Sequence, residues 1–409
     1  MLMLWRVAWR NLWRQGRRSM LTVSAMAVGV ALCMAMFALI DGMYTRMFDV
    51  MVSQALGHVQ VHHQAWPADQ QLYDTVPEVD ALLAAIDADP GVKAATVRLS
   101  CFGLAAGDKT SAGARFMGVD PDREDQVTQL KRRVVRGSYL DAAKPNGVLI
   151  GAGLAEELEV EPGGEIVMIS QGADGSIANA LFDVVGVVET GSTMLDRAGV
   201  WTPLPALQST LVLPNQVHEL LILSDDLDTL PALKDRVEAA GGDQLMVRTW
   251  QEANPQAALL IGSQTTSKTL ILFVVFSVSA LGVLNTMMMN VFERTRELGV
   301  LKAIGLSPAK MMALVLLEAA QLGVLASAVG VGLGLLIDLY LVKVGVAMSK
   351  SGEPMSFGGV SFDPIMRGEV RVEGIVITVV FVFFVSIVAA VWPGLRAARL
   401  QPVDAMRQR

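Results

Sequence analysis

The sequence has little charge, few aromatic residues and almost no cysteine. Of its 409 residues, 18% are charged and 6% aromatic, against 52% hydrophobic, and the mean hydropathy is +0.45. This composition excludes an ordinary water-soluble protein and is typical of a chain with both membrane-spanning and water-soluble parts. Of the two cysteines, Cys33 lies in an apolar run and Cys101 in a polar region, so we expect no disulfide between them.

The sequence also lacks the motifs of a catalytic site. The stretch GLAAGDKT at 103–110 has the wrong glycine spacing for a phosphate-binding loop. GVGLG at 330–334 lies in an apolar run with no strand before it, where glycines favour close helix packing in lipid. No spacing suggests a Ser-His-Asp group or a carboxylate pair. We expect this chain to bind no metal or cofactor and no nucleic acid.

Three of the four histidines cluster at His58, His62 and His63. His58 and His62 are four residues apart and would share one face of a strand. A metal site, and with it a membrane-bound enzyme, is one interpretation, which needs further ligands from elsewhere. The alternative, polar side chains on an exposed strand, is favoured.

Four apolar stretches are long enough to cross a bilayer, which takes about 20 residues. They cover roughly residues 19–40, 268–291, 311–343 and 374–392. The polar region between the first two alternates short strands with helices, which predicts an α+β domain of mostly antiparallel type. The expected fold class is therefore a membrane α-helical protein with four transmembrane helices and a large α+β domain inserted between helices 1 and 2.

Basic residues indicate which segments lie in the cytoplasm. Residues 1–18, 292–310 and the tail after 392 carry 13 basic and 3 acidic residues, a net +10, whereas the whole chain carries −7 and the remainder −17. Both termini are therefore predicted in the cytoplasm and the large domain on the far side. The predicted segments are an interfacial helix (1–18), helix 1 and a stalk (19–56), the outer domain (57–255), a stalk and helix 2 (256–291), a cytoplasmic helix (292–310), helix 3 (311–343), an outer loop (344–373), helix 4 (374–392) and a cytoplasmic tail (393–409).

The first cytoplasmic segment is amphipathic. Tryptophans and arginines each repeat every four residues, as two neighbouring helical stripes: Trp5, Trp9 and Trp13, and Arg6, Arg10 and Arg14. Tryptophan prefers the membrane interface, and arginine can extend its head group to lipid phosphates. We predict a short helix lying on the inner leaflet before the first span.

The stretch FERTRELGVLKAIGLSP at 292–308 predicts a second short helix, between the second and third spans. Gly305 suits the left-handed residue that ends a helix, and Ser307 and Pro308 suit the start of the next one. Leu298, Leu301 and Ile304 would form an apolar stripe. A solvated turn would explain the charges of this helix but not the stripe, so we favour a surface that fits a partner's groove.

These motifs resemble those of a known family. ERTRELGVLKAIGLSPAKMMALVLLEA (293–319) resembles the signature of the FtsX-like, or MacB-type, ABC transporter permeases, and RAARLQPVDAMR (396–407) is similar to their C-terminal motif. The order of one span, a large periplasmic domain and three spans also resembles theirs. Within the family, the length, the strand at 57–63 and the segment 137–170 look most like the lipoprotein-releasing, LolC/LolE-like permeases.

The resemblance implies an inner-membrane permease subunit of a bacterium, with no ATPase site of its own. Its partners would be a cytoplasmic ABC ATPase dimer, which binds ATP and Mg, a second permease of the same or a homologous sequence, membrane lipid, and a periplasmic chaperone or adaptor. The short helix at 292–310 would couple the permease to the ATPase. By motif match, the coupling residues are Glu293, Arg294, Arg296, Glu297, Leu298, Gly299, Leu301, Lys302 and Gly305.

The implied function is the ATP-driven movement of lipoproteins or another amphiphile from the outer leaflet. Acyl chains would enter a groove between the first and second spans of the two permeases, which maps to Val23, Ala27, Val30, Met34, Phe273, Phe276 and Leu284. The stretch QGADGSIANA (171–180) departs from the protruding loop with which some of these permeases recruit a chaperone, because it is short and lacks prolines and bulky apolar residues. Tripartite efflux of drugs or peptides, and mechanical control of a periplasmic hydrolase, are the alternatives.

Overall fold

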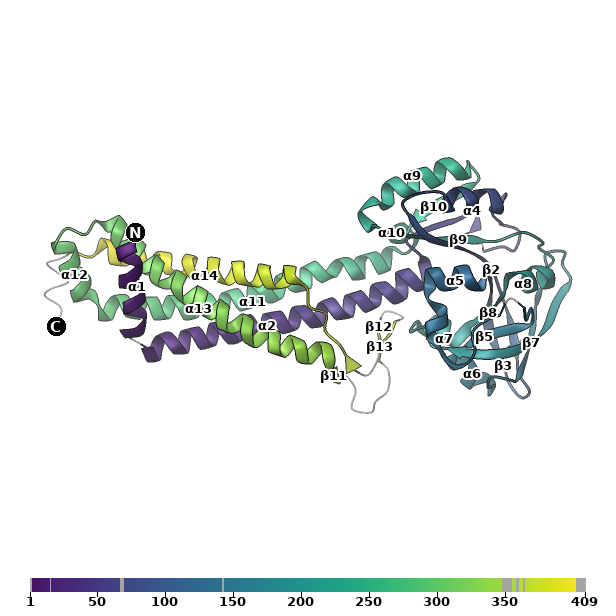
Figure 1. Ribbon diagram of the computed structural model, residues 1–409, viewed down its shortest axis with the longest axis horizontal. Coiled ribbons are helices and arrows are strands. Elements are labelled where there is room, and N and C mark those ends of the chain that lie inside the picture. The colour runs from purple at the N-terminus through teal and green to yellow at the C-terminus, as the bar shows by residue number, and fades with distance from the viewer. Residues whose placement is uncertain are drawn as a thin grey trace. The chain divides into compact units, whose positions relative to one another are not determined.

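The computed structural model describes residues 2–14, 16–66, 70–141, 143–347, 355–357, 360–362 and 365–401 (Figure 1). The chain divides into two compact units. The helical unit consists of Met1–Tyr44, Gly262–Lys350 and Ile365–Arg409, and the mixed unit of Thr45–Ile261 and Ser351–Pro364. The end of the predicted tail and much of the predicted loop at 344–373 lie outside the described residues.

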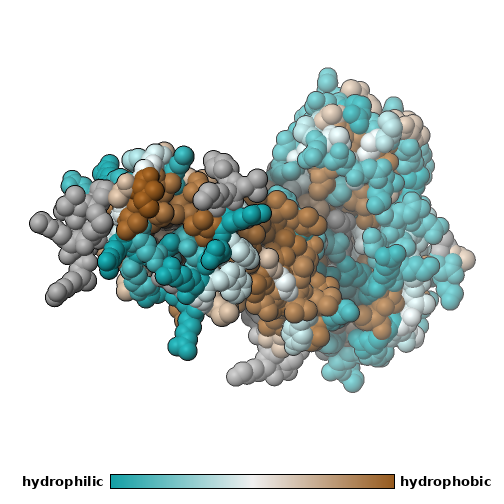
Figure 2. Space-filling view, turned by 60° about the vertical axis from the view of Figure 1, so that its left-hand side comes forward, coloured by the Kyte–Doolittle hydropathy of each residue, from teal (hydrophilic) through white to brown (hydrophobic). Residues whose placement is uncertain are grey.

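Four helices of the described chain are long and apolar enough to cross a membrane, and they coincide with the four predicted spans: α2 (Gly16–Phe48), α11 (Pro255–Glu293), α13 (Pro308–Lys343) and α14 (Val372–Arg399). Two shorter helices flank them in sequence, α1 (Leu2–Arg14) and α12 (Thr295–Ala303). Two small antiparallel strand pairs follow α13: β11 (Val346–Ala347) with β14 (Ile365–Met366), and β12 (Met355–Phe357) with β13 (Val360–Phe362). Figure 2 shows hydrophobic residues over much of the sides of the long helices.

Glycines of α13 let the neighbouring helices approach it closely. A Cβ added to Gly330 would lie 2.6 Å from Cβ of Val30 in α2, and one added to Gly334 would lie 2.7 Å from the sulfur of Met34. Both distances are shorter than atoms can approach without displacement. The prediction that GVGLG serves helix packing is therefore confirmed for Gly330 and Gly334, whereas a Cβ at Gly332 would meet nothing within 4 Å.

The mixed unit is built on one large sheet with the strand order β10–β1–β9–β2–β3–β8–β5–β7–β4, in which β6 pairs with β2 and β7. The strands are β1 (Val59–His63), β2 (Val92–Ala106), β3 (Ser111–Val119), β4 (Val134–Gly137), β5 (Gly147–Gly151), β6 (Glu165–Gln171), β7 (Ile177–Val188), β8 (Gly199–Pro203), β9 (Glu219–Ser224) and β10 (Leu245–Thr249). The helices are the π-helix η1 (Asp49–Leu56), α4 (Val79–Asp87), α5 (Pro121–Thr128), α6 (Ala152–Leu158), α7 (Thr193–Ala198), α8 (Leu204–Leu211), α9 (Leu230–Gly241) and α10 (Trp250–Ala253), with 3-10 turns η2 (Leu130–Arg133) and η3 (Leu227–Thr229). The strands pair mostly antiparallel, as predicted, with β3–β8 and β5–β7 parallel.

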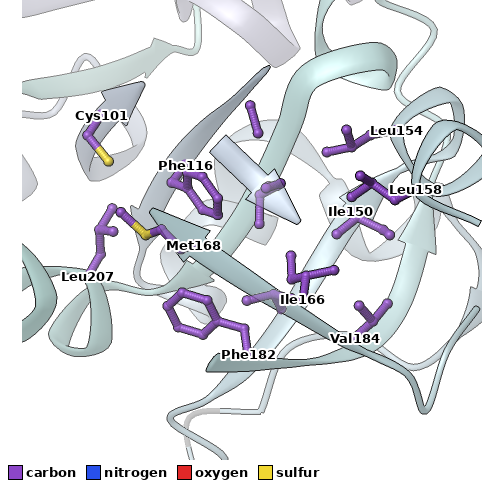
Figure 3. Packing of buried hydrophobic residues seen from close by; sticks show 14 of the residues in the cluster. Cys101, Phe116, Ile150, Leu154, Leu158, Ile166, Met168, Phe182, Val184 and Leu207 are labelled. Atoms are coloured by element: carbon purple, nitrogen blue, oxygen red, sulfur yellow. The ribbon is translucent and has the colours of Figure 1, made fainter. Parts of the chain in front are cut away.

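Six of these strands close into a barrel, because the pairings β2–β3–β8–β5–β7–β6 return to β2. The first part of the long strand β2 pairs with β9 (residues 92–98), and its second part pairs with β3 (residues 98–106). Alternate residues of the barrel strands point inward, as strand geometry requires. Phe116, Ile150, Met168 and Phe182, from four different strands, meet in this core (Figure 3).

Candidate functional site

The connection from α12 to α13 has the caps that the sequence predicts. Gly305 has φ = +105°, which a residue with a side chain rarely adopts, and no atom lies within 4 Å of where its Cβ would be. The N–H of Leu306 donates to the carbonyl of Leu301 at 3.0 Å, which closes the end of α12. Ser307 Oγ then accepts from the backbone of α13, and Pro308 is its first residue. The chain thus reverses within a few residues and fixes α12 against the start of α13.

One face of α12 packs inward and the other is exposed. Leu298 and Gly299 are buried, and Lys302 Nζ donates to the carbonyls of Ala398 and Leu400 at the end of α14. The predicted apolar stripe is therefore wrong in one member, because Leu298 belongs to the core of the helical unit. Steps of three residues rotate about 300° each, so Leu298 and Ile304 lie on different sides of the helix.

The exposed stripe runs along Arg296, Val300 and Ile304, with Leu301 at its edge. The side chain of Ile304 is 79% exposed, and that of Val300 is 42% exposed. The motif match did not include Val300 and Ile304, which lie four and eight residues after Arg296 and therefore share its side of the helix. This stripe joins one cation to three large apolar side chains and is not covered by the described part of the chain.

Two acidic residues pair with arginines near the N-terminus: Glu297 of α12 pairs with Arg14 of α1, and Glu293 at the end of α11 pairs with Arg18 of α2. Glu297 lies 2.9 Å from Arg14 and 3.1 Å from Arg294, and Glu293 lies 2.9 Å from Arg18. Partial burial raises the pKa of the Glu297 carboxyl, but Arg294 and Arg14 outweigh this effect and hold the pKa below its usual value. Glu297 is therefore ionised at neutral pH and links α12 to α1, while also pairing with Arg294 at the start of its own helix.

A buried carboxylate in α13 extends this network. Glu318 accepts hydrogen bonds from Asn11 of α1 at 2.7 Å and from Arg294 at 3.0 Å. Gln321, one turn further along α13, donates to the carbonyl of Trp5. An ionisable residue buried among apolar helices needs such partners, since an unpaired charge there is costly. Helices α1, α12 and α13 are thus joined by a continuous set of polar contacts.

The residues predicted to line a substrate groove divide into two groups. Ala27, Val30 and Met34 of α2 are buried, and Val30 and Met34 pack against the glycines of α13. These three side chains are therefore not open to a substrate in this structure, and the groove itself stays a prediction. Phe273 of α11 is 63% exposed, and Val23 and Leu284 are half-buried. Phe276 belongs to α11, but its side chain lies outside the described part of the chain.

The histidine cluster does not form one ligand set. His58 Nδ1 accepts from the backbone of Ser224, His62 Nε2 shares a hydrogen bond with Gln60, and His63 lies 3.7 Å from Asp74. Among the described residues, no group of three or more His, Cys, Asp or Glu side chains is placed to hold a metal. The expectation of an exposed strand is also wrong, because β1 lies between β9 and β10 and only His63 of its five residues is not buried.

The outer face of the barrel carries an apolar patch that the sequence analysis missed. Its six large side chains come from β2, β6 and β7 and are exposed to solvent: Phe102, Leu104, Val167, Ile169, Ile177 and Leu181. Leu104 lies opposite Ile169, and Val167 lies opposite Leu181, so the patch is continuous across the three strands. The run IVMI at 166–169 would have indicated this patch, because all four residues are apolar and so both faces of the strand are apolar. Only one of these faces is needed for the core.

Comparison with known proteins decides the family. Residues 19–240, more than half of the chain, match the family described as MacB-like periplasmic core domain, and residues 269–402 match the FtsX-like permease C-terminal region. The chain belongs to the MacB-like family. The predicted membership of the FtsX-like, MacB-type ABC permeases is therefore confirmed.

Relatives of this MacB-like chain cover nearly all of it. It is 24% identical over 398 residues to the lipoprotein-releasing system transmembrane protein LolC of Neisseria meningitidis, covering 95% of this chain and 94% of that protein. It is 21% identical to LolE of Haemophilus influenzae, covering 93% of this chain and 92% of that one. It is 24% identical to the macrolide export ATP-binding/permease protein MacB 2 of Aeromonas hydrophila, covering 95% of this chain but 58% of that one.

The family match bears on location as well as on fold. The large domain of this MacB-like permease is the periplasmic core domain of the family, and four of its described helices are long enough to span a membrane. The predicted location, in the inner membrane with the large domain in the periplasm, is confirmed.

Proposed function

We propose that this chain is the permease subunit of an ABC transporter that moves lipoproteins or another amphiphile out of the outer leaflet of the inner membrane. A separate cytoplasmic ATPase dimer binds ATP and Mg and supplies the energy, and a second permease, identical or homologous, completes the complex. Both termini and α12 lie in the cytoplasm. The similarity to LolC and LolE over almost the full length of both chains supports this substrate class.

The observation that carries the proposal is the exposed stripe of α12. A helix held between two membrane-length helices, with Arg296, Val300 and Ile304 facing away from the unit, suits a groove on another protein. The inward residues Leu298, Gly299 and Lys302 fix α12 to the spans. A force on the stripe is thus transmitted to α13 and α14. Glu293, Arg294 and Glu297 hold this geometry, and Gly305 allows the turn that creates it.

The groove for the acyl chains of the substrate lies on the exposed faces of α2 and α11, not on the face of α2 that the sequence suggested. Exposed apolar side chains repeat every four residues along α2 at Val28, Leu32 and Met36. On α11, Phe273 and Val274 are exposed at comparable levels. We place the groove on these lipid-facing stripes, where the second permease would close it.

The apolar patch of the barrel is the surface for a periplasmic chaperone or adaptor. Large apolar side chains exposed together on a water-soluble domain indicate a binding site, and the patch borders the hairpin at 171–177. Replacing both Ile169 and Leu181 by Asp should abolish binding of the partner without unfolding the barrel. Val135→Asp changes a similarly exposed residue of β4 and should leave binding intact.

The test of the proposed function is a release assay. The chain, its ATPase and its second permease are reconstituted in vesicles with a labelled triacylated lipoprotein, and ATP-dependent release to a periplasmic carrier is followed. Release with wild-type chain and its loss with Ile304→Asp support the proposal. ATP-dependent export of a small drug, with no effect on lipoprotein, would favour the efflux function that the similarity to MacB 2 suggests.

A further inference from the structure

The N-terminal helix α1 presents three distinct faces. Ala8 and Leu12 are buried in the helical unit. Each following residue lies about 100° further round the helix, so a tryptophan stripe comes next and an arginine stripe after it. The exposed fractions of Trp5, Trp9 and Trp13 are 47%, 40% and 56%. One face thus holds the protein, one suits the apolar edge of a leaflet, and one suits head groups.

The charge of this segment is one-sided. Residues 2–18 carry five arginines and no acidic residue. Arg14 and Arg18 pair with Glu297 and Glu293, whereas Arg6, Arg10 and Arg17 are exposed and make no ion pair with any part of the chain that the structure describes. Arg6 and Arg10 lie beside the tryptophan row of α1, and Arg17 follows in the first turn of α2. These cations complement anionic lipid head groups more closely than zwitterionic ones.

We propose that α1 is a docking face for anionic phospholipid in the cytoplasmic leaflet, and that lipid bound there steadies α12. The link is direct, because the Arg14 side chain is 69% exposed yet reaches Glu297. Asn11 and Trp5, on the same helix, contact α13. Lipid that fixes the position of α1 therefore also fixes the position of α12. This inference rests on contacts within the chain and does not depend on the proposed transport function.

The first experiment measures lipid preference by fluorescence quenching of the full chain in vesicles. The variant Trp392→Phe removes the exposed tryptophan of α14, and the tryptophans of the mixed unit are buried: Trp66, Trp201 and Trp250. The three tryptophans of α1 therefore supply most of the fluorescence that brominated lipid can quench. The probe is acyl-brominated phosphatidylglycerol or phosphatidylcholine at equal mole fraction. Each arginine near an anionic leaflet should raise local affinity about fivefold, so the brominated phosphatidylglycerol should quench more.

A charge-matched pair of variants makes this result specific. Replacing Arg6, Arg10 and Arg17 by Gln should abolish the preference. Replacing three exposed cations of the mixed unit by Gln should preserve it: Lys131, Arg132 and Lys144. Equal quenching by both lipids in the wild type, or a preference that survives in the variant that lacks Arg6, Arg10 and Arg17, would overturn the proposal. An equal loss of quenching by both lipids would also contradict it, since the arginines would then hold the helix at the surface without selecting lipid.

The second experiment tests the link to α12 by hydrogen exchange. Phosphatidylglycerol should slow amide exchange in α12 severalfold relative to phosphatidylcholine alone. In the double variant Glu293→Gln and Glu297→Gln, the slowing should disappear while the quenching preference of α1 remains. Exchange in α12 that does not respond to phosphatidylglycerol in the wild type would refute the link.

Discussion

Arg14 Nη2 lies 2.9 Å from Glu297 Oε1, and this contact joins the first helix of the chain to a helix almost 300 residues later. Exposed ion pairs of this kind contribute about 0.2–1 kcal/mol each. The pair acts together with Arg18–Glu293 and with Glu318, which binds Asn11 and Arg294. The network therefore fixes the position of α12 relative to α1 and α13 and adds little to the free energy of unfolding.

Reversing the charge of Glu297 should disturb this position. In Glu297→Lys, a cation would stand between Arg14 and Arg294, and α12 would lose both contacts. We expect lipoprotein-stimulated ATP hydrolysis to fall severalfold, with helix content unchanged by circular dichroism. Glu156→Lys, on an exposed position of α6, is the control and should keep normal rates. Unchanged hydrolysis and release in Glu297→Lys would show that the Arg14–Glu297 contact does not contribute to coupling.

The turn after α12 depends on the backbone of Gly305. Proline has φ near −65°, so Gly305→Pro is incompatible with the observed +105° and should separate α12 from α13. Gly305→Ala meets no atom and should cost about 1–2 kcal/mol of strain only. We expect hydrolysis in the absence of substrate to persist in both variants and transport to be lost with Pro and reduced with Ala. Equal transport by Pro and wild type would show that the turn is dispensable.

Two glycines of α13 give a matched test of helix packing. A Cβ at Gly330 would lie 2.6 Å from Val30, whereas one at Gly332 meets nothing within 4 Å. Gly330→Ala should therefore destabilise the helical unit by about 1–3 kcal/mol. Gly332→Ala should be neutral or slightly stabilising, because alanine is the better helix former. Thermal unfolding in detergent compares the two, and similar melting temperatures would contradict the packing observed between α2 and α13.

The mixed unit should lose stability in mild acid. Burial lowers the pKa values of His62 and His218, because it disfavours the imidazolium, although Glu219 partly offsets this for His62. As pH falls below the ordinary histidine value of 6.5, the unfolded chain takes up protons first, so the free energy of unfolding decreases. The slope should not exceed about 1.4 kcal/mol per pH unit for each histidine.

Glu219 adds to the loss of stability at lower pH. Burial raises the pKa of its carboxyl, but Arg115 and Arg98 outweigh burial and hold the pKa below the usual 4.5. Its contribution is therefore complete above pH 4.5 and is lost as pH falls through the folded value. Hydrogen exchange in β1 and β9 from pH 7.5 to 4 would follow both effects. His62→Gln should flatten the profile between pH 7 and 5, and an unchanged profile would exclude His62.

Much of the fold can be predicted from the sequence, because membrane spans and strands depend on local residue patterns. The cap residues of α12 and α13 are local too, and Gly305, Ser307 and Pro308 lie where their chemistry predicts. The closure of six strands into a barrel is not local. It depends on pairings such as Leu104 with Ile169, far apart in the chain, which a single sequence does not contain.

The candidate site was predicted less well, because hydrophobicity does not reveal which apolar face meets protein and which meets lipid. In a membrane segment both faces are apolar, so Val30 and Met34 were assigned to a groove although they pack against Gly330 and Gly334. Exposure alone separates them from Leu32. On α12, by contrast, the family motif includes residues of both faces and does not distinguish the buried face from the exposed one.

The most direct test of the account is binding of the cytoplasmic ATPase to variants of the exposed stripe of α12. Ile304→Asp and Val300→Asp place a charge on that surface and should each weaken ATPase binding by about tenfold or more, measured on the full chain in nanodiscs. The control is Ala303→Ser, which changes an exposed residue of α12 without adding a charge. Wild-type affinity in both Asp variants would contradict the claim that the ATPase acts on the permease through α12.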